Sequence, residues 1–302
     1  MRAMFELERG RQRLVVAEVG AALRSWTVAG HELIDAHDGA ETAFAGKVLV
    51  PWPNRIRDGR YVFDGVEHRV AITEAERGNA LHGLTTGRRW RATRSSTRHL
   101  TLVCDLRPEA GYPFALRLAA GYELTSDGVV ITLRANNVGT ERAPFGAGIH
   151  PYLTLGGRRI DDELLELPAR ARLPVDDRLL PAGSPTPVAR TEADFRTRRP
   201  IGGLRVDACF TELERSAAGV ARIRLASATG GRRVTLWMDE HFRYVQVYTA
   251  DAVPDAARRR HSIAIEPMTC APDAFNTGAG LLVLEPGAAF IGRCGLIAAG
   301  FA

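Results

Sequence analysis

Alternation of apolar and polar residues with a period of two is the feature that most constrains the fold of this 302-residue chain. Residues 116–124 alternate in this way, and so do residues 100–106, 131–135 and 234–238. Successive side chains of a β-strand point to opposite faces, so each run places one face on a core and the other toward water or a second layer. Helical spacing is scarce, and the best helical candidate, residues 191–198, is short. The chain is therefore predicted to be mainly β.

Turn-forming residues separate these runs. Asp64-Gly65 lies between two β-rich segments and predicts a short hairpin, because both residues tolerate a positive φ. Residues 168–200 are rich in proline and least regular, yet the same alternation flanks them on both sides. We interpret them as a long excursion bordering a cleft rather than as a linker. We predict one domain over residues 1–302, a large antiparallel β-sandwich of two sheets.

The charged residues argue against several classes of protein. The net charge is +5, and Lys47 is the only lysine. The arginines are interspersed with acidic residues instead of forming one basic stripe with aromatic residues, so we expect no nucleic-acid partner. A single lysine also argues against Schiff-base chemistry on pyridoxal phosphate.

The cysteines and the familiar catalytic motifs exclude further classes. The four cysteines are widely spaced and form no CxxC pair, so we expect reduced, mostly buried thiols and no metal site. GxGxxG, HExxH and GxSxG are missing, which argues against nucleotide binding, zinc proteolysis and serine hydrolysis. No apolar run approaches the ~18 residues of a membrane helix, and the charged N-terminal residues do not resemble a signal peptide. We expect a cytoplasmic protein without a membrane partner.

Five short polar segments supply the candidate chemistry. They are Asn54-Arg55-Ile56, Leu81-His82-Gly83, Gly148-Ile149-His150-Pro151-Tyr152, Asp207-Ala208-Cys209-Phe210 and Ile265-Glu266-Pro267. Each alone is a weak signal: a histidine beside Gly or Pro is more often structural, and Arg55 beside Arg57 and Asp58 fits a surface ion-pair set. Together, two histidines, two carboxylates and an arginine suit proton transfer on a polar, uncharged substrate. Such a reaction needs a base and an acid, expected on opposite sides of a reacting C–O centre.

In their order along the chain, these segments resemble the aldose 1-epimerase (galactose mutarotase) family. The shared pattern is Asn-Arg near residue 55, His-Gly at 82, His-Pro-Tyr at 150, Asp-x-Cys-Phe at 207 and Glu-Pro…Pro-Asp-Ala-Phe-Asn over 266–276. The ordered set is much more specific than any single member. The resemblance implies a galactose mutarotase-like supersandwich with the sugar in an open cleft, and interconversion of α and β anomers of free aldoses without metal or cofactor.

The resemblance also assigns roles to single residues. It implies that Glu266 is the general base for the C1 hydroxyl and that His150 is the general acid for the ring oxygen. It implies that His82 and Arg55 contact the sugar hydroxyls and the ring-oxygen side, and that Asp207 accepts a hydroxyl hydrogen bond. Residues 244–249 are candidates for lining the cleft, with no contact assigned.

Several alternatives stay open in the sequence. The segment after Glu266, Pro-Met-Thr, differs from that of the best-known galactose-active members, so glucose, galactose and less common aldoses are all candidate substrates. A hexose-6-phosphate 1-epimerase would need arginines besides Arg55 to converge on a phosphate. A non-catalytic sugar-binding protein could keep the same sandwich. A glycosidase or polysaccharide lyase would also use two carboxylates, but the motif order argues against it. We expect a small-molecule sugar as partner and a monomer or homodimer.

Overall fold

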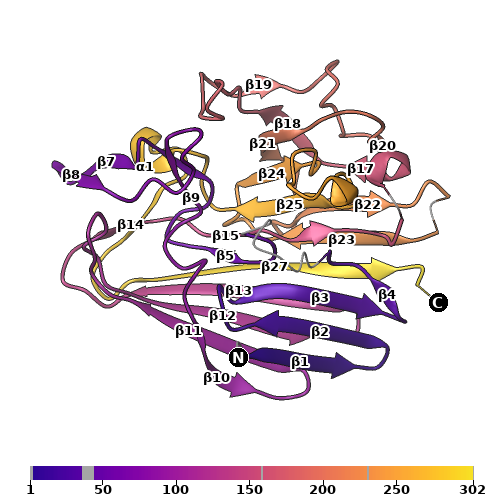
Figure 1. The fold of residues 1–302 in the computed structure, drawn as a ribbon, viewed down its shortest axis with the longest axis horizontal. Helices are drawn as coiled ribbons and strands as arrows, with labels where there is room; N and C mark the ends of the chain where they lie inside the picture. The colour runs from indigo at the N-terminus through magenta and orange to yellow at the C-terminus, as the bar shows by residue number, and fades with distance from the viewer. Residues whose placement is uncertain (1–2, 36–43, 158, 230, 302) are drawn as a thin grey trace.

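The fold is built from layered antiparallel β-sheets, as Figure 1 shows. The computed structural model describes residues 3–35, 44–157, 159–229 and 231–301. Within those ranges the helical elements are short: the α-helix α1 (Ala274–Thr277) and the 3₁₀ turns η2 (Ile160–Asp162) and η3 (Ala256–Arg258). The prediction of an all-β, antiparallel fold is thereby confirmed.

Two large sheets dominate. The first contains, in spatial order, β10 (Arg91–Ser95), β11 (His99–Leu106), β12 (Leu116–Leu124), β13 (Gly128–Asn137), β27 (Ala289–Ala299), β23 (Arg233–Met238), β22 (Ala221–Ala226), β17 (Leu164–Glu166) and β20 (Arg199–Pro200). The second contains β19 (Thr186–Pro187), β18 (Ala169–Arg172), β21 (Asp207–Leu213), β24 (Tyr244–Tyr248), β25 (Ile263–Met268), β15 (Gly148–Ile149) and β5 (Val48–Leu49), with β16 (Tyr152–Leu153) paired to β25.

Smaller sheets complete the fold. The N-terminal sheet contains β1 (Met4–Arg9), β2 (Gln12–Ala17), β3 (Ala22–Val28) and β4 (His31–Glu32). The two-stranded pairs are β6 (Arg55–Arg57) with β9 (Asn79–Leu81), β7 (Arg60–Phe63) with β8 (Val66–Arg69), and β14 (Ala143–Phe145) with β26 (Leu282–Leu284). In Figure 1 the indigo N-terminal sheet lies beside the magenta strands β11–β13. The buried Tyr122 hydroxyl of β12 donates to the Ala21 carbonyl and ties these two layers together.

The alternation in the sequence predicts which side chains form the core. On β12, the even-numbered residues 116–124 are buried, while Arg117 on the opposite face is exposed. On β24, Val245 and Val247 face the main core cluster, and on β25 Ile263 and Ile265 do the same. The residues between them on β24 and β25 consequently face away from this core, and that second face carries the polar residues of the candidate site.

The local predictions have mixed outcomes. The hairpin at Asp64-Gly65 is confirmed by β7 and β8, which pair antiparallel. The helix expected over residues 191–198 is wrong, because that segment forms turns and bends. There the Thr191 hydroxyl bonds the Val188 carbonyl and the Asp194 carboxylate accepts from the Arg196 N–H. Such side chain–backbone bonds compete with helix formation in a segment too short to nucleate one.

The proline-rich excursion is more regular than its sequence suggests. Its residues form β18 and β19 of the second large sheet and β20 of the first. Arg178, in the loop after β18, donates to the carbonyls of Arg77 and Gly78 and to the Asn79 side chain. The excursion is thereby bonded to the segment before β9, next to the candidate site.

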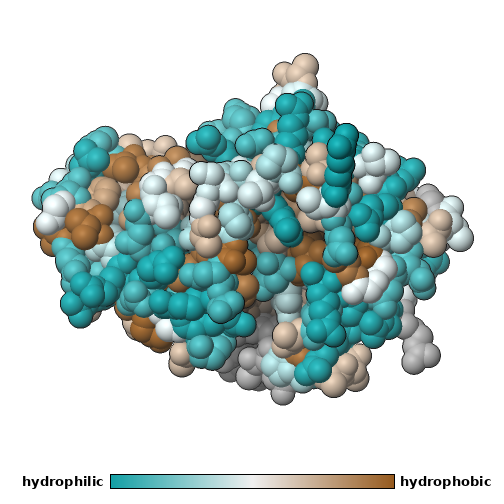
Figure 2. Space-filling model, turned by 90° about the horizontal axis from the view of Figure 1, so that it is seen from above, coloured by the Kyte–Doolittle hydropathy of each residue, from teal (hydrophilic) through white to brown (hydrophobic). Residues whose placement is uncertain are grey.

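Hydrophilic residues cover most of the face seen in Figure 2, and hydrophobic residues form small separate groups on it. The large apolar residues that are exposed include Val62 and Val66 of the β7–β8 hairpin. Among the described residues, no helix has the length and apolar character that crossing a membrane requires.

A buried arginine joins three loops at one edge of this fold. The Arg260 side chain is 7% exposed and donates to Asp161 at 2.6 Å and to Asp251 at 2.7 Å. Its guanidinium also donates to the carbonyls of Gly202 and Leu204. All of these acceptors lose a charged donor if the guanidinium is removed.

We therefore expect Arg260→Ala to lower the free energy of unfolding by about 2 kcal/mol, because it removes a buried charged donor from two carboxylates and two backbone carbonyls. The matched control is Arg205→Ala. Arg205 lies 3.9 Å from the same Asp251, but its side chain is 85% exposed, so its loss should cost less than about 0.5 kcal/mol. Urea unfolding followed by tryptophan fluorescence measures both. Equal losses in the two variants would contradict the structural role of Arg260.

Candidate active site

The register of the second sheet brings a carboxylate and an imidazole together. Gly148 of β15 pairs with Met268 of β25, so the chain direction carries His150 back toward Glu266. His150 Nε2 lies 3.3 Å from Glu266 Oε1, and both side chains are buried. The prediction that an acid and a base lie on opposite sides of a reacting C–O centre stays a prediction.

The pKa of Glu266 is raised well above its ordinary value. Burial is the main cause, because a dry environment penalises the carboxylate, and the negative charge of Asp207 adds to it. The Arg55 guanidinium acts in the opposite direction. A carboxyl with a raised pKa holds a proton more readily than an exposed one, and it is a stronger base when it is ionised.

Asp207 and Gln246 extend the same face of the sheet. Asp207 begins β21 and pairs with Tyr248, while Gln246 pairs with Glu266. Gln246 Nε2 donates to Asp207 Oδ1 at 2.6 Å, which fixes that carboxylate, and Gln246 Oε1 is buried without a hydrogen-bond partner among the described residues. The Asp207 side chain reaches solvent, yet surrounding protein atoms exclude enough water to raise its pKa, against the influence of Arg55.

Arg55 is held by a carboxylate that the motifs do not include. Its Nε and Nη2 donate to the two oxygens of Glu74, each at 2.8 Å, and both side chains are buried. The second hydrogen bond to Glu74 Oε2 comes from the Asn79 amide. This bidentate pair keeps the guanidinium plane fixed. Arg57, by contrast, is partly exposed and lies near Asp176 and the buried Asp273. The expected surface ion-pair set with Asp58 is therefore wrong for Arg55.

His82 is oriented by the backbone of Asn54. The backbone N–H of Asn54 donates to His82 Nδ1 at 3.1 Å. The backbone N–H of His82 donates to the Asn54 carbonyl at 2.8 Å. An imidazole nitrogen that accepts a hydrogen bond carries no proton, so the neutral ring has its proton on Nε2. Both residues have φ near 60°, and a Cβ on the adjacent Gly83 would lie 2.2 Å from the Val50 carbonyl oxygen. The tight backbone turn therefore sets the direction of the ring.

The three central side chains also form the only group in the described part of the chain whose ligand atoms suit a metal ion. One such atom from each of His82, His150 and Glu266 lies within 4.8 Å of the others. A ligating nitrogen must be unprotonated, and the Asn54 hydrogen bond places the proton of neutral His82 on Nε2. This tautomer favours hydrogen bonding over metal binding at Nε2.

The structure thus brings together the five residues singled out in the sequence. His82 and His150 are ring neighbours with centroids 5.3 Å apart, and the charge of Arg55 acts on His82, Asp207 and Glu266. Sequence reasoning missed Glu74, and it flagged the segment of Gln246 without assigning a contact. A polar residue inside an otherwise apolar buried strand, as in Tyr-Val-Gln-Val-Tyr, is the signal that could have identified Gln246.

Known proteins share both the sequence pattern and the fold. The family model described as aldose 1-epimerase matches residues 3–294. The uncharacterized protein YihR of Escherichia coli (strain K12) is 34% identical over 284 residues, which cover 93% of this chain and 88% of YihR. An aldose 1-epimerase of the same strain is 29% identical over 219 residues, or 69% of this chain and 61% of that protein.

Solved structures confirm the prediction of a galactose mutarotase-like fold. A GalM/aldose epimerase homologue from C. elegans superposes with a TM-score of 0.88 over 99% of both chains, at 18% identity. The galactose 1-epimerase from Lactobacillus acidophilus has a TM-score of 0.80 over 99% of this chain and 98% of its own, at 20% identity.

The hydrogen bond and the burial of His82 predict that its ring is neutral, which can be tested. Burial lowers the pKa of His82 well below its ordinary value, and the charges of His150 and Arg55 lower it further. We expect His82 to stay neutral, with its proton on Nε2, while the pH falls from 8 through about 6.5. Long-range ¹H–¹⁵N correlation spectra measure this, with the His82→Gln variant assigning the signals. Protonation of both ring nitrogens at about pH 6.5 would contradict it.

Proposed function

This chain belongs to the aldose 1-epimerase family, and we propose that it interconverts the α and β anomers of a free aldose such as glucose or galactose. The observation that carries the proposal is the pair of buried groups, His150 and Glu266, 3.3 Å apart. Ring opening of an aldose requires removal of a proton from the C1 hydroxyl and delivery of a proton to the ring oxygen. Both oxygens are bonded to the same carbon, so a neighbouring base and acid suit them.

Glu266 serves as the base in this proposal. Its raised pKa means that taking the C1 hydroxyl proton relieves the cost of a buried charge. As the proton leaves, the C1–O5 bond breaks and C1 becomes an aldehyde carbon. Nearly simultaneous transfer to the ring oxygen avoids a costly oxyanion in a dry site, and each positioned transfer is typically worth ~10²–10⁴-fold in rate.

His150 serves as the acid that protonates the ring oxygen. Its ring stacks on Tyr152 with the centroids 4.9 Å apart and meets the His82 ring edge-on at 5.3 Å, which restricts its orientation. After rotation about the C1–C2 bond of the open chain, the two roles reverse. His150 then takes the proton back and Glu266 returns one to the new C1 hydroxyl, as microscopic reversibility requires.

The remaining residues hold the sugar. The Nε2–H of His82 is a fixed donor, and the guanidinium of Arg55 offers further donors from a position fixed by Glu74. Asp207, fixed by Gln246, accepts hydrogen bonds from hydroxyls. Charge-assisted bonds of this kind orient a polyhydroxylated ring. The sugar's preferred configuration depends on these contacts.

Polarimetry on freshly dissolved α-D-glucose and α-D-galactose tests the activity, with chelator-treated protein and a protein-free control. We expect faster approach to an unchanged final rotation, because a catalyst alters the rate and not the equilibrium. The same assay with glucose 6-phosphate distinguishes a hexose-6-phosphate epimerase. Saturable binding of these sugars without acceleration would contradict the catalytic proposal and favour a protein that only binds sugar.

Substitutions in the pair test the two roles. We expect Glu266→Gln and His150→Ala each to slow turnover by ~10²–10⁴-fold, because each removes one proton transfer. The matched control is Glu285→Gln, since Glu285 also precedes a proline at the end of an apolar strand but is exposed. Circular dichroism checks that all three variants are folded. Near-normal turnover in folded Glu266→Gln would exclude this residue as the base.

A further inference from the structure

A pocket that shares no residue with the candidate active site has the chemistry of a second ligand site. Its volume is about 720 Å³, within the range of small-molecule pockets. The walls come from the residues after β16, from η2, from the β22–β23 connection and from η3. None of the five candidate site residues lines it.

A buried carboxyl forms part of the wall. Glu163 is 6% exposed, and its Oε2 is buried without a hydrogen-bond partner among the described residues. Burial raises the pKa of Glu163 to about 8, partly offset by the Leu155 N–H. The group is therefore mostly protonated at pH 7 and can donate to, or accept from, an uncharged hydroxyl. A buried polar atom without a partner is costly, and a ligand hydroxyl would satisfy it.

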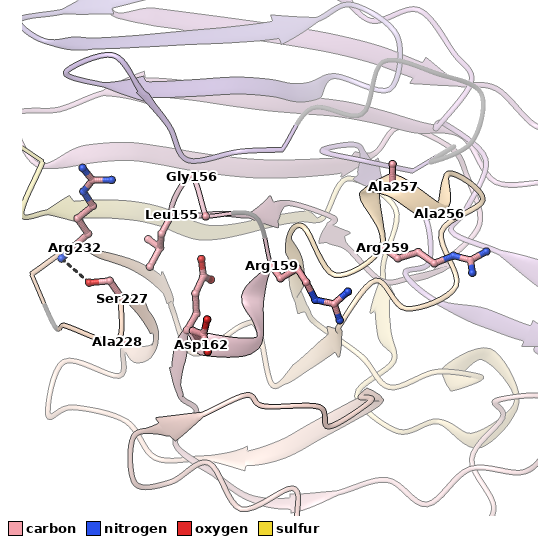
Figure 3. A pocket seen from close by; sticks show the side chains of 12 residues that line it. Leu155, Gly156, Arg159, Asp162, Ser227, Ala228, Arg232, Ala256, Ala257 and Arg259 are labelled. Atoms are coloured by element: carbon pink, nitrogen blue, oxygen red, sulfur yellow. Dashed lines mark hydrogen bonds between the residues drawn. The ribbon is translucent and has the colours of Figure 1, made fainter.

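Three arginines stand at the rim on two sides. In Figure 3, Arg232 lies with Ser227 on one side of Leu155, and Arg159 lies with Arg259 on the other. Arg159 donates from Nε to Asp161, and Arg259 donates from Nε to the Val253 carbonyl. The guanidinium of Arg232 lies over the ring of Phe301. Within the described ranges, their terminal Nη atoms make no hydrogen bond with protein.

The nearby acidic residues leave two of these three arginines without an ion pair. Asp161 pairs with Arg159 at 2.6 Å, whereas Arg232 and Arg259 have no carboxylate partner within the described ranges, and Asp162 also lies in the lining. Arginine forks bind carboxylates and phosphates in a bidentate manner. A ligand that reaches both sides of Leu155 would meet arginines at its ends, with Ser227 beside Arg232 and the neutral Glu163 carboxyl in the same pocket.

We propose that this pocket binds a polyhydroxylated organic molecule that carries an anionic group at each end. The arginines on the two sides bind the terminal anions, and Glu163 binds a hydroxyl of the carbon chain. The site is independent of the proposed epimerase activity, because its residues and those of the pair His150 and Glu266 do not overlap.

A matched series of six-carbon ligands tests the proposal by isothermal titration calorimetry on the full chain. D-Glucarate has two terminal carboxylates, D-gluconate has one and D-sorbitol has none. These compounds lack an anomeric carbon, so none is a substrate for the candidate active site. We expect D-glucarate to bind ~10-fold or more tightly than D-gluconate, and D-sorbitol weakest, because each end adds charge-assisted hydrogen bonds.

Variants locate the binding. Arg232→Gln and Arg259→Gln should each weaken D-glucarate binding ~10-fold and leave the affinity for D-sorbitol nearly unchanged. Arg107→Gln is the control, because Arg107 is an exposed arginine outside the pocket. Glu163→Ala should weaken all three ligands, whereas Glu163→Gln, which keeps neutral hydrogen-bonding groups, should retain binding. Glu266→Gln should bind D-glucarate as the unmodified protein does.

Several results would overturn the proposal. Equal affinity for D-glucarate and D-gluconate would exclude recognition of two ends. An equal loss in Arg107→Gln and Arg232→Gln would show charge attraction without a site. Loss of D-glucarate binding in Glu266→Gln, or its absence in the unmodified protein at millimolar ligand, would remove the pocket as a binding site for this class.

Discussion

Burial of a carboxyl on the central strand β25 is the constraint on which the candidate site depends. Glu266 is 2% exposed and has β24 on one side and the β15–β16 segment on the other. A buried charge is expensive, so the group is either protonated or close to compensating partners. Both apply to Glu266: burial raises its pKa, which favours the protonated form, and Arg55 and His150 lie close enough to compensate a negative charge. The chemistry of the site follows from this balance.

The Arg55–Glu74 ion pair limits how far the positive charge of Arg55 lowers the pKa of Glu266. A lone buried guanidinium would hold Glu266 ionised and make the site strongly cationic, whereas a fully paired one leaves a modest field. Glu74 takes two hydrogen bonds from Arg55 and further ones from Asn79 and Arg77. Burial acts to raise the pKa of Glu74, but the two arginines and the Asn79 hydrogen bond lower it below its ordinary value. Arg178 then bonds the Asn79 side chain to the proline-rich excursion. Residues remote in the sequence therefore hold Arg55 in place.

The sequence predicts the strands better than it predicts the site's connections. Alternation over residues 116–124 identifies β12 because burial of every second side chain is a local property. The partner of Arg55 is not local: Asp58 is three residues away, while the observed Glu74 is nineteen away. Only the fold decides between them. The adjacency of His150 and Glu266 likewise depends on strand register, which a motif order does not contain. The helix predicted over residues 191–198 does not form, because local hydrogen bonds of the Thr191 and Asp194 side chains compete with a short helical pattern.

Two buried glutamates in this fold have raised pKa values but different neighbours, which suits them to the two different roles proposed for them. Burial raises the pKa of both Glu266 and Glu163. Glu266 has an imidazole nitrogen 3.3 Å away, and the charges of Asp207 and Arg55 act on its pKa. A group that can exchange a proton with this carboxyl is therefore beside it. The pKa of Glu163 is governed by burial and the Leu155 N–H alone, and its Oε2 faces no partner in the described structure. A carboxyl without a proton acceptor beside it serves as a neutral hydrogen-bonding group, which suits recognition of hydroxyls and not their ionisation.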